Sequence, residues 1–185
     1  MRVDIWSDVV CPFCFIGKKR LEKAAEQAGV ELEVFWHSYQ LDPDAPIRQE
    51  KSNSERLAEK YNRSIAEVEE MQRNIAAMAK EEAIEFNWEH ANSGNTFNAH
   101  RIIHLAQSLN LGNEAKEAFF YSYMTQGLAI GERETIEDVA ARIGLNPNQV
   151  EDVLNSDEFA EFVKYDEEVA RDQLKVTGVP FFVFD

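Results

Sequence analysis

Cys11-Pro12-Phe13-Cys14 contains the only two cysteines of this 185-residue chain, and it lies where two sequence patterns meet. Before it, Arg2–Trp6 is a short apolar run that predicts a strand, and after it a helical pattern extends from Phe15 to about Ala28. Pro12 suits the first helical position, where its missing N–H costs nothing. A Cys-x-x-Cys pair at such a junction favours a dithiol–disulfide switch. Its sulfurs lie about one turn apart, and the positive end of the helix stabilises the first as a thiolate.

Two further strands are predicted, one on each side of a long middle region. The first helix is expected to end at Gly29, a common C-cap residue. Glu31–Tyr39 then begins with polar–apolar alternation and is rich in aromatic side chains, which predicts the second strand. Strand, helix and strand form a βαβ unit with parallel strands and a right-handed crossover. Near the end of the chain, Gly178–Phe184 predicts a third strand that starts at Pro180, because proline has no N–H for the ladder.

The middle region, from about Asn53 to Lys175, shows only helical patterns, among them an amphipathic stripe. We therefore expect an α/β fold in two parts. Residues 1–45 plus 176–185 form the sheet domain, and residues 46–175 form an inserted all-helical domain. The stripe consists of Ile65, Val68, Met71, Ile75 and Met78, and further helices are predicted at Thr96–Ser108, Glu114–Thr125, Thr135–Ile143, Pro147–Leu154 and Asp157–Lys175.

The chain is acidic, with 34 acidic and 19 basic side chains and a formal net charge of −15. The acidic residues are spread over helical stretches without a basic footprint, so the composition argues against a nucleic-acid partner. No apolar run has the length of a signal peptide or a membrane span, which predicts a cytoplasmic protein with no membrane partner. In such a reducing compartment, a Cys-x-x-Cys pair is more often catalytic or metal-bound than a structural disulfide.

Three motifs stand out along the chain: Ser7-Asp8-Val9-Val10-Cys11-Pro12-Phe13-Cys14-Phe15-Ile16-Gly17, Asn95-Thr96-Phe97-Asn98-Ala99-His100-Arg101 and Gly178-Val179-Pro180-Phe181-Phe182-Val183. Together, and in this order, they resemble the DsbA family of thioredoxin-like oxidoreductases, most closely its FrnE-like cytoplasmic branch. The resemblance covers essentially the whole chain. It implies a thioredoxin fold with a large inserted all-helical domain, disulfide exchange at the dithiol, and a cis peptide bond before Pro180.

The sequence departs from the family pattern at its end. In the family another strand and a closing helix follow the strand at Pro180, whereas this sequence stops at Asp185. Residues Phe181–Phe184 would then form an aromatic edge strand, which is prone to association. We therefore expect either a longer chain or completion of the sheet by a neighbouring molecule, and a homodimer is left open.

The resemblance implies three catalytic residues. Cys11, at the helix start, is the exchanging sulfur, Cys14 is the resolving thiol, and Pro180 supports them. The backbone of Val179 would lie opposite the sulfurs and pair with an extended substrate strand. Phe13 adds neither a cation nor a side-chain donor, so we expect weaker thiolate stabilisation than in a strongly oxidising relative.

Four further residues are candidate contacts of the substrate: Pro12, Phe13, Asn95 and His100. For two of them a structural role is also open. Asn95 can be the N-cap of its helix, and His100 can be a helix histidine that bonds to backbone or water. Asp8 precedes the dithiol and either tunes it or accepts a hydrogen bond from a turn amide.

Three other functions are left open. Zinc could bind Cys11, Cys14, His100 and His104, although no second cysteine pair exists and no metal site is expected. A glutathione-dependent isomerase or transferase shares the fold, but 2-hydroxychromene-2-carboxylate isomerases and kappa-class transferases typically carry Ser where Cys11 stands. A peptide-binding, chaperone-like module would use the cleft alone. The favoured function is disulfide exchange with protein or small-molecule thiols, with the cysteine pair as redox centre and glutathione as one candidate cosubstrate.

Overall fold

The computed structural model describes all residues 1–185 and contains one three-stranded sheet. Its strand order is β2 (Glu33–Ser38), β1 (Arg2–Ser7), β3 (Phe181–Phe184). β1 and β2 are parallel, with Val3 opposite Val34, whereas β3 runs antiparallel to β1, with Ile5 opposite Phe182. The predicted parallel pair and the strand at the end of the chain are therefore confirmed.

The first helix, α1 (Pro12–Ala28), begins three residues earlier than the helical pattern indicated. Pro12 occupies its first turn, where the fixed φ of proline fits a helix and its missing N–H removes no bond. The helix ends at Gly29 as predicted. Gly29 has a φ of 65°, and its N–H bonds to the carbonyls of Ala25 and Glu26.

A continuous run of helices connects β2 to β3, as the sequence predicted. The prediction of one long last helix at Asp157–Lys175 is wrong in its bounds, because the structure has α8 at Ala160–Glu168 and a π-helical turn at Val169–Gln173. Phe159 has a φ of 61° and delays the start of that helix to Ala160, and a π-helical turn follows Glu168. These helices are α2 (Asn53–Tyr61), α3 (Ile65–Glu81), α4 (Phe97–Ser108), α5 (Gly112–Met124), α6 (Arg133–Arg142), α7 (Pro147–Asn155), α8 (Ala160–Glu168) and the π-helical turn η1 (Val169–Gln173).

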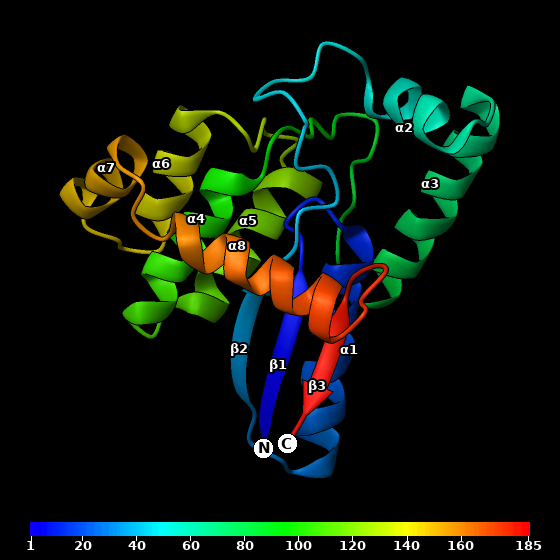
Figure 1. The fold of residues 1–185 in the computed structure, drawn as a ribbon. Coiled ribbons are helices and arrows are strands. Elements are labelled where there is room, and N and C mark those ends of the chain that lie inside the picture. Colours follow the sequence, from blue (N-terminus) through cyan, green and yellow to red (C-terminus); the bar gives the residue numbers. More distant parts are fainter.

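The helical region shares a hydrophobic core with the sheet. A cluster of 29 buried residues includes Ile5 and Trp36 of the strands together with Ile102 of α4 and Phe120 of α5. The rings of Trp36 and Phe120 meet edge to face at 6.4 Å. In Figure 1, α8 crosses one face of the sheet, α1 covers the other, and the remaining helices gather beyond the carboxyl ends of β1 and β2. The expected domain boundaries at 45/46 and 175/176 fall in loops that flank the helical run.

A buried carboxylate at the centre of α8 ties this helix to the sheet. Asp166 accepts hydrogen bonds from the ring of His37 at 2.8 Å, the backbone N–H of Ser38 at 2.8 Å and the ring of His104 at 3.1 Å. Its carbonyl accepts the indole N–H of Trp6 at 2.9 Å. Burial raises the pKa of Asp166, but the hydrogen bonds from His104 and His37 outweigh burial and bring it to about 2. The carboxylate is therefore ionised, and it joins β1, β2, α4 and α8.

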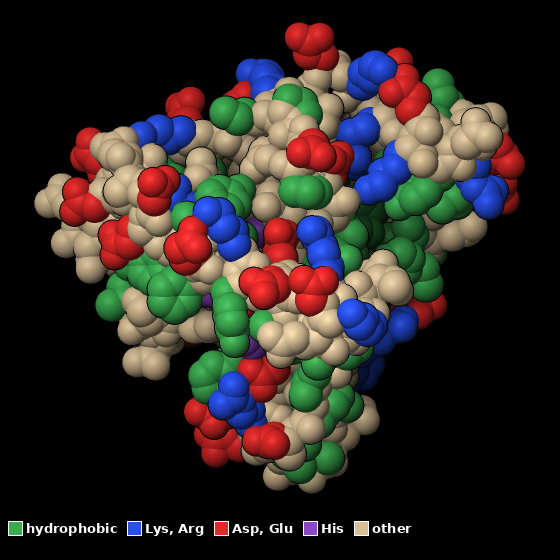
Figure 2. Space-filling model, viewed as in Figure 1, with side chains coloured by type: hydrophobic (Ala, Val, Ile, Leu, Met, Phe, Trp, Pro, Cys, Tyr) green, Lys and Arg blue, Asp and Glu red, His purple; other side chains and the backbone are tan.

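Charged side chains of both signs are scattered over the face shown in Figure 2. Beside α3 the surface is hollowed, and hydrophobic side chains line the hollow. None of the helices combines the length and the apolar character needed to cross a membrane.

Candidate functional site

The two cysteines lie at the start of α1, and both are free thiols. Cys11 is the N-cap with extended backbone (φ −94°, ψ 111°), and Cys14 stands in the first turn with its N–H bonded to the Cys11 carbonyl at 3.1 Å. Cys11 is 4% exposed and Cys14 is 1% exposed. Of the two cysteines, only Cys11 lines a pocket that lies against α2 and α3, so it is the sulfur that a ligand entering this pocket meets.

The loop before β3 approaches the dithiol from the side. The peptide bond between Val179 and Pro180 is cis, as the resemblance implied. The thiol of Cys11 donates to the Val179 carbonyl at 3.5 Å. Val179 is thus next to the Cys11 sulfur, as expected. Pro12 and Phe13 line the pocket. Phe13 is 46% exposed, which leaves its ring accessible to a substrate.

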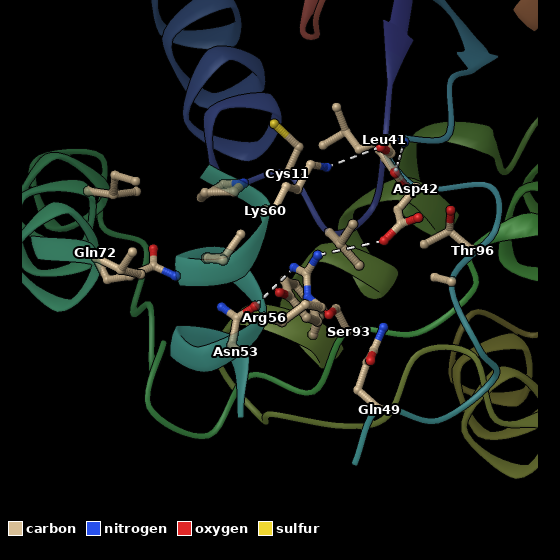
Figure 3. A pocket seen from close by; sticks show the side chains of 18 of the residues that line it. Cys11, Leu41, Asp42, Gln49, Asn53, Arg56, Lys60, Gln72, Ser93 and Thr96 are labelled. Atoms are coloured by element: carbon tan, nitrogen blue, oxygen red, sulfur yellow. Dashed lines mark hydrogen bonds and ion pairs between the residues drawn. The ribbon is translucent and has the colours of Figure 1, made fainter. Parts of the chain in front are cut away.

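The pocket has a volume of about 160 Å³ and extends from Cys11 to α2 and α3. One wall is apolar. Val68, Met71 and Ile75 of the amphipathic stripe face the pocket, so part of the stripe that predicted helix packing forms a ligand surface. Gly94 lies on the opposite rim, where a Cβ atom would come within 2.2 Å of the Ile47 carbonyl oxygen. Figure 3 shows this pocket with the polar residues labelled.

The cationic wall of the pocket comes from α2, and the carboxylates of Asp8 and Asp42 line the same pocket. Figure 3 shows Arg56 and Lys60 projecting from this helix toward Asp42 and Leu41. Arg56 donates to the Asn53 side chain at 3.1 Å and lies 3.8 Å from the Asp42 carboxylate, and its buried Nε has no partner. Lys60 donates to the Leu41 carbonyl at 3.2 Å. These cations keep unused donors toward the pocket, which suits an acidic ligand.

The sequence analysis did not identify this cationic wall. Its one signal is spacing, because positions 53, 56 and 60 share one face of a helix. Two further polar groups line the pocket. The hydroxyl of Ser93 is buried without a hydrogen-bond partner, and Gln72 is only 4% exposed. The Ser93 hydroxyl and the Arg56 Nε are thus buried polar groups beside the pocket without a hydrogen-bond partner.

Asp8 connects the pocket with a buried histidine. Its carboxylate accepts the N–H of Leu41 at 2.8 Å and lies 3.3 Å from the ring of His100. Burial raises the pKa of Asp8, but the hydrogen bond and charge of His100, the Leu41 N–H and the Lys116 ammonium together outweigh it, and the pKa lies below its ordinary value. Burial lowers the pKa of His100. His100 is 1% exposed and does not line the pocket, so the structure places it behind Asp8 rather than against a substrate.

Asn95 is also outside the pocket lining. Its amide donates to the Pro43 carbonyl at 2.9 Å, and its oxygen accepts the N–H of Phe97 at 3.0 Å. The N-cap of α4 is Thr96, one residue later than the sequence suggested. Asn95 therefore stabilises the loop and the first turn of α4.

The two cysteine thiols lie in different surroundings, which shift their pKa values in opposite directions. The neighbouring Cys14 thiol raises the pKa of Cys11, and burial raises it further. Burial also raises the pKa of Cys14, but the Cys11 thiol, the Ser7 hydroxyl and the Lys116 ammonium outweigh it and lower this pKa. The Ser7 hydroxyl is buried and forms no hydrogen bond of normal geometry. These groups surround Cys14, whereas Cys11 faces a carbonyl that favours its protonated form.

The structure does not bring the proposed zinc ligands together. His100 is bonded to Asp8, and His104 is bonded to Ser38 and Asp166. No group of three or more His, Cys, Asp or Glu side chains is arranged to hold a metal ion. The four residues therefore do not form one site in this structure.

Comparison with known proteins gives one consistent result. The family model for the DsbA-like thioredoxin domain matches residues 2–185. A crystal structure of a probable DsbA oxidoreductase from Streptomyces coelicolor is similar with a TM-score of 0.91 and 33% identity, over 99% of this chain and 80% of that one.

Two more distant solved structures share the fold. A 2-hydroxychromene-2-carboxylate isomerase has a TM-score of 0.72 and 18% identity, over 100% of this chain and 86% of that one. The cytosolic disulfide reductase DsbM from Pseudomonas aeruginosa, solved with GSH, has a TM-score of 0.71 and 15% identity, again over 100% and 86%. The α/β fold with a helical region between its strands is thus shared by redox enzymes and an isomerase.

Proposed function

Because the chain belongs to the family of DsbA-like thioredoxin domains, we propose that it is a thiol–disulfide oxidoreductase that acts through Cys11 and Cys14. The observation that carries this proposal is the position of the two thiols. Cys11 is the N-cap of α1 and borders the pocket, and Cys14 is in the first turn behind it. The three motifs favour the FrnE-like branch within the family, and with it a cytoplasmic location.

The proposed reaction reduces a disulfide in two exchange steps. Cys11 loses its proton to the medium and its thiolate attacks one substrate sulfur, which forms a mixed disulfide; the departing thiolate takes up a proton and leaves as the first substrate thiol. Cys14 then loses its proton to the medium and attacks Cys11, which forms the protein disulfide and releases the second thiol. The lowered pKa of Cys14 favours this second step. Reduction or isomerisation is the direction that suits a reducing compartment.

The pocket favours a small acidic substrate, and we propose glutathione or its mixed disulfides. Arg56 and Lys60 line the pocket that Cys11 borders, in a chain whose net charge is −15, and the carboxylates of Asp8 and Asp42 also line it. A volume of about 160 Å³ is below the range of roughly 300–1,000 Å³ typical of whole-ligand pockets, so it would hold one arm of the ligand. The structural similarity to DsbM, solved with GSH, supports this choice.

The proposal is tested by equilibration of the protein in a series of glutathione buffers. Alkylation of free thiols and tryptophan fluorescence report the redox state, and protein with both thiols blocked is the control. We expect one two-electron transition that ends in an intramolecular disulfide between Cys11 and Cys14. Thiols that stay reduced throughout the series would overturn the proposal.

Arg56→Met tests the acidic substrate. With glutathione disulfide as substrate, we expect KM to rise about tenfold while kcat changes little, because a charged hydrogen bond to a ligand is worth roughly 1.5–3 kcal/mol. With the neutral hydroxyethyl disulfide, KM should not change. Arg63→Met is the matched control, since this arginine is exposed and pairs only with Glu67 at 3.7 Å. Equal effects on both substrates would show that Arg56 does not recognise a carboxylate.

A further inference from the structure

The pocket beside the dithiol carries charges of both signs, and only some of them are satisfied within the protein. Four charged residues line it: Asp8, Asp42, Arg56 and Lys60. Asp8 is satisfied, because one carboxylate oxygen accepts the Leu41 N–H at 2.8 Å and the other lies 3.3 Å from the ring of His100. The charges that remain available to a ligand are therefore one carboxylate, on Asp42, and the two cations of α2.

Asp42 and Arg56 face each other at the pocket without forming a hydrogen bond. Their closest atoms, Oδ2 and Nη1, are 3.8 Å apart, and Figure 3 shows the carboxylate turned toward the guanidinium. This contact is longer than a hydrogen bond, and the Asp42 side chain is 41% exposed. The guanidinium donates to the Asn53 side chain at 3.1 Å, and its buried Nε has no partner. Both groups thus keep hydrogen-bonding capacity for a ligand.

The backbone on both sides of Asp42 is held in place. Before it, the N–H of Leu41 is bound to Asp8 at 2.8 Å. After it, the carbonyl of Pro43 accepts the side-chain amide of Asn95 at 2.9 Å. Asn95 therefore supports a pocket residue without lining the pocket itself. A carboxylate on a fixed segment loses little conformational freedom when a ligand binds, which favours affinity.

A ligand group with a single charge fits this arrangement poorly. A carboxylate against Arg56 would also lie near the Asp42 carboxylate, and an ammonium against Asp42 would also lie near the guanidinium, so each would be repelled by a like charge. A group that carries both signs on neighbouring atoms satisfies both side chains at once. The α-amino acid head is such a group, because its ammonium and its carboxylate are attached to one carbon.

On the basis of the proposed function, we infer that the pocket recognises the zwitterionic α-amino acid head of a small thiol or disulfide, and that Asp42 is the residue that selects for its ammonium. Asp42 accepts the ammonium, and Arg56 donates to the ligand carboxylate. Lys60 has further N–H donors for that carboxylate beyond the one it gives to the Leu41 carbonyl. The hydroxyl of Ser93, a residue only 5% exposed, lines the same pocket without a partner. The γ-glutamyl end of glutathione and free cysteine both carry this head.

The experiment measures the binding of S-methylglutathione and of its N-acetyl derivative to the reduced protein by isothermal titration calorimetry. The sulfur of both ligands is blocked, so no exchange takes place, and acetylation removes the ammonium. We expect wild type to bind S-methylglutathione about fivefold more tightly, the upper end for a partly exposed ion pair. Acetylation also adds bulk, and Asp42→Asn separates charge from size. The preference should disappear in this variant, because an amide carries no charge to attract the ammonium.

Asp44→Asn is the matched control for Asp42→Asn. It makes the same change of charge two residues further along the segment, but Asp44 is exposed and does not line the pocket. The wild-type preference should remain in this control. Asparagine is nearly isosteric with aspartate and suits turns, so both variants should keep the wild-type unfolding temperature. A preference that survives in Asp42→Asn, or that both variants lose equally, would overturn the inference. Tighter binding of both ligands to Asp42→Asn would also overturn it, because Asp42 would then only compete for Arg56.

S-methylcysteine identifies which molecule supplies the head, because it carries the same head without the rest of glutathione. If its binding also depends on Asp42, the inference is supported, and the tighter of the two ligands names the source. Failure of the proposed function has a different signature. The wild-type protein would then form no disulfide in any glutathione buffer, whereas the binding of the blocked ligands does not depend on exchange.

Discussion

Cys11→Ser lowers the rate of disulfide exchange by roughly a thousandfold or more, because a hydroxyl at this position cannot act as the thiolate nucleophile. Cys11 is the only sulfur that borders the pocket, so no other group can form the mixed disulfide. The measurement is the rate of glutathione disulfide reduction at saturating substrate. Since serine is nearly isosteric with cysteine, the thermal stability of the variant should stay close to that of wild type.

Cys14→Ser is the companion variant, and we expect it to block a later step of the reaction than Cys11→Ser does. The exchange should stop after the first step and leave a mixed disulfide on Cys11, because the resolving thiol is absent. Intact mass after incubation with glutathione disulfide detects one added glutathione. Normal turnover of this variant would show that a second substrate thiol, rather than Cys14, resolves the intermediate.

The double variant separates the remaining alternatives. A peptide-binding module would keep its function with Ser at both positions, whereas an oxidoreductase would lose it. The isomerase alternative predicts retained isomerase activity in the variants, since related isomerases typically carry Ser where Cys11 stands. The free thiol of Cys11 at the pocket and the free thiol of Cys14 behind it favour disulfide exchange over the peptide-binding and isomerase alternatives.

The sheet and the first helix could be predicted from the sequence because their signals are local. A strand pattern before Cys11, a proline suited to the first helical turn and Gly29 at the C-cap specify this segment through neighbouring residues alone. The apolar pattern starts only at Phe15, whereas Pro12, which suits the first helical position, marks the true start of the helix after the N-cap Cys11. Phe159 illustrates the opposite case: a left-handed φ at a phenylalanine has no local sequence signal.

The electrostatics of the site could not be predicted, because they depend on residues far apart in the chain. Lys116 reads as one more surface lysine of an amphipathic helix, and only the packing of α5 against β2 and α1 buries it completely. Similarly, the stripe on α3 predicted packing, but a stripe does not specify whether it faces the core or a pocket. Met71 is 39% exposed and lines the pocket wall.

Asp166→Ala is expected to destabilise the protein by about 3–5 kcal/mol, which is the second large effect. The substitution removes a 6% exposed carboxylate and leaves His37, His104 and the Ser38 N–H without their partner. Urea unfolding measures the loss. The matched control is Asp172→Ala, an exposed carboxylate in η1, which should change the free energy of unfolding by less than about 0.5 kcal/mol.

The difference in stability between wild type and Asp166→Ala should also depend on pH. The pKa of Asp166 falls from 3.8 to about 2, so its stabilisation is present above the unfolded value and is lost as the pH falls through 2. Burial lowers the pKa of His37, but the bonds to Asp166 and Asp4 outweigh it and raise the pKa above 6.5. The stabilisation from protonated His37 is present below pH 6.5 and is lost as the pH rises through the raised pKa of His37. The difference in the free energy of unfolding between wild type and Asp166→Ala should therefore be largest between about pH 4 and 6.5. An equal difference at pH 6 and pH 9 would show that the His37–Asp166 ion pair does not stabilise the fold.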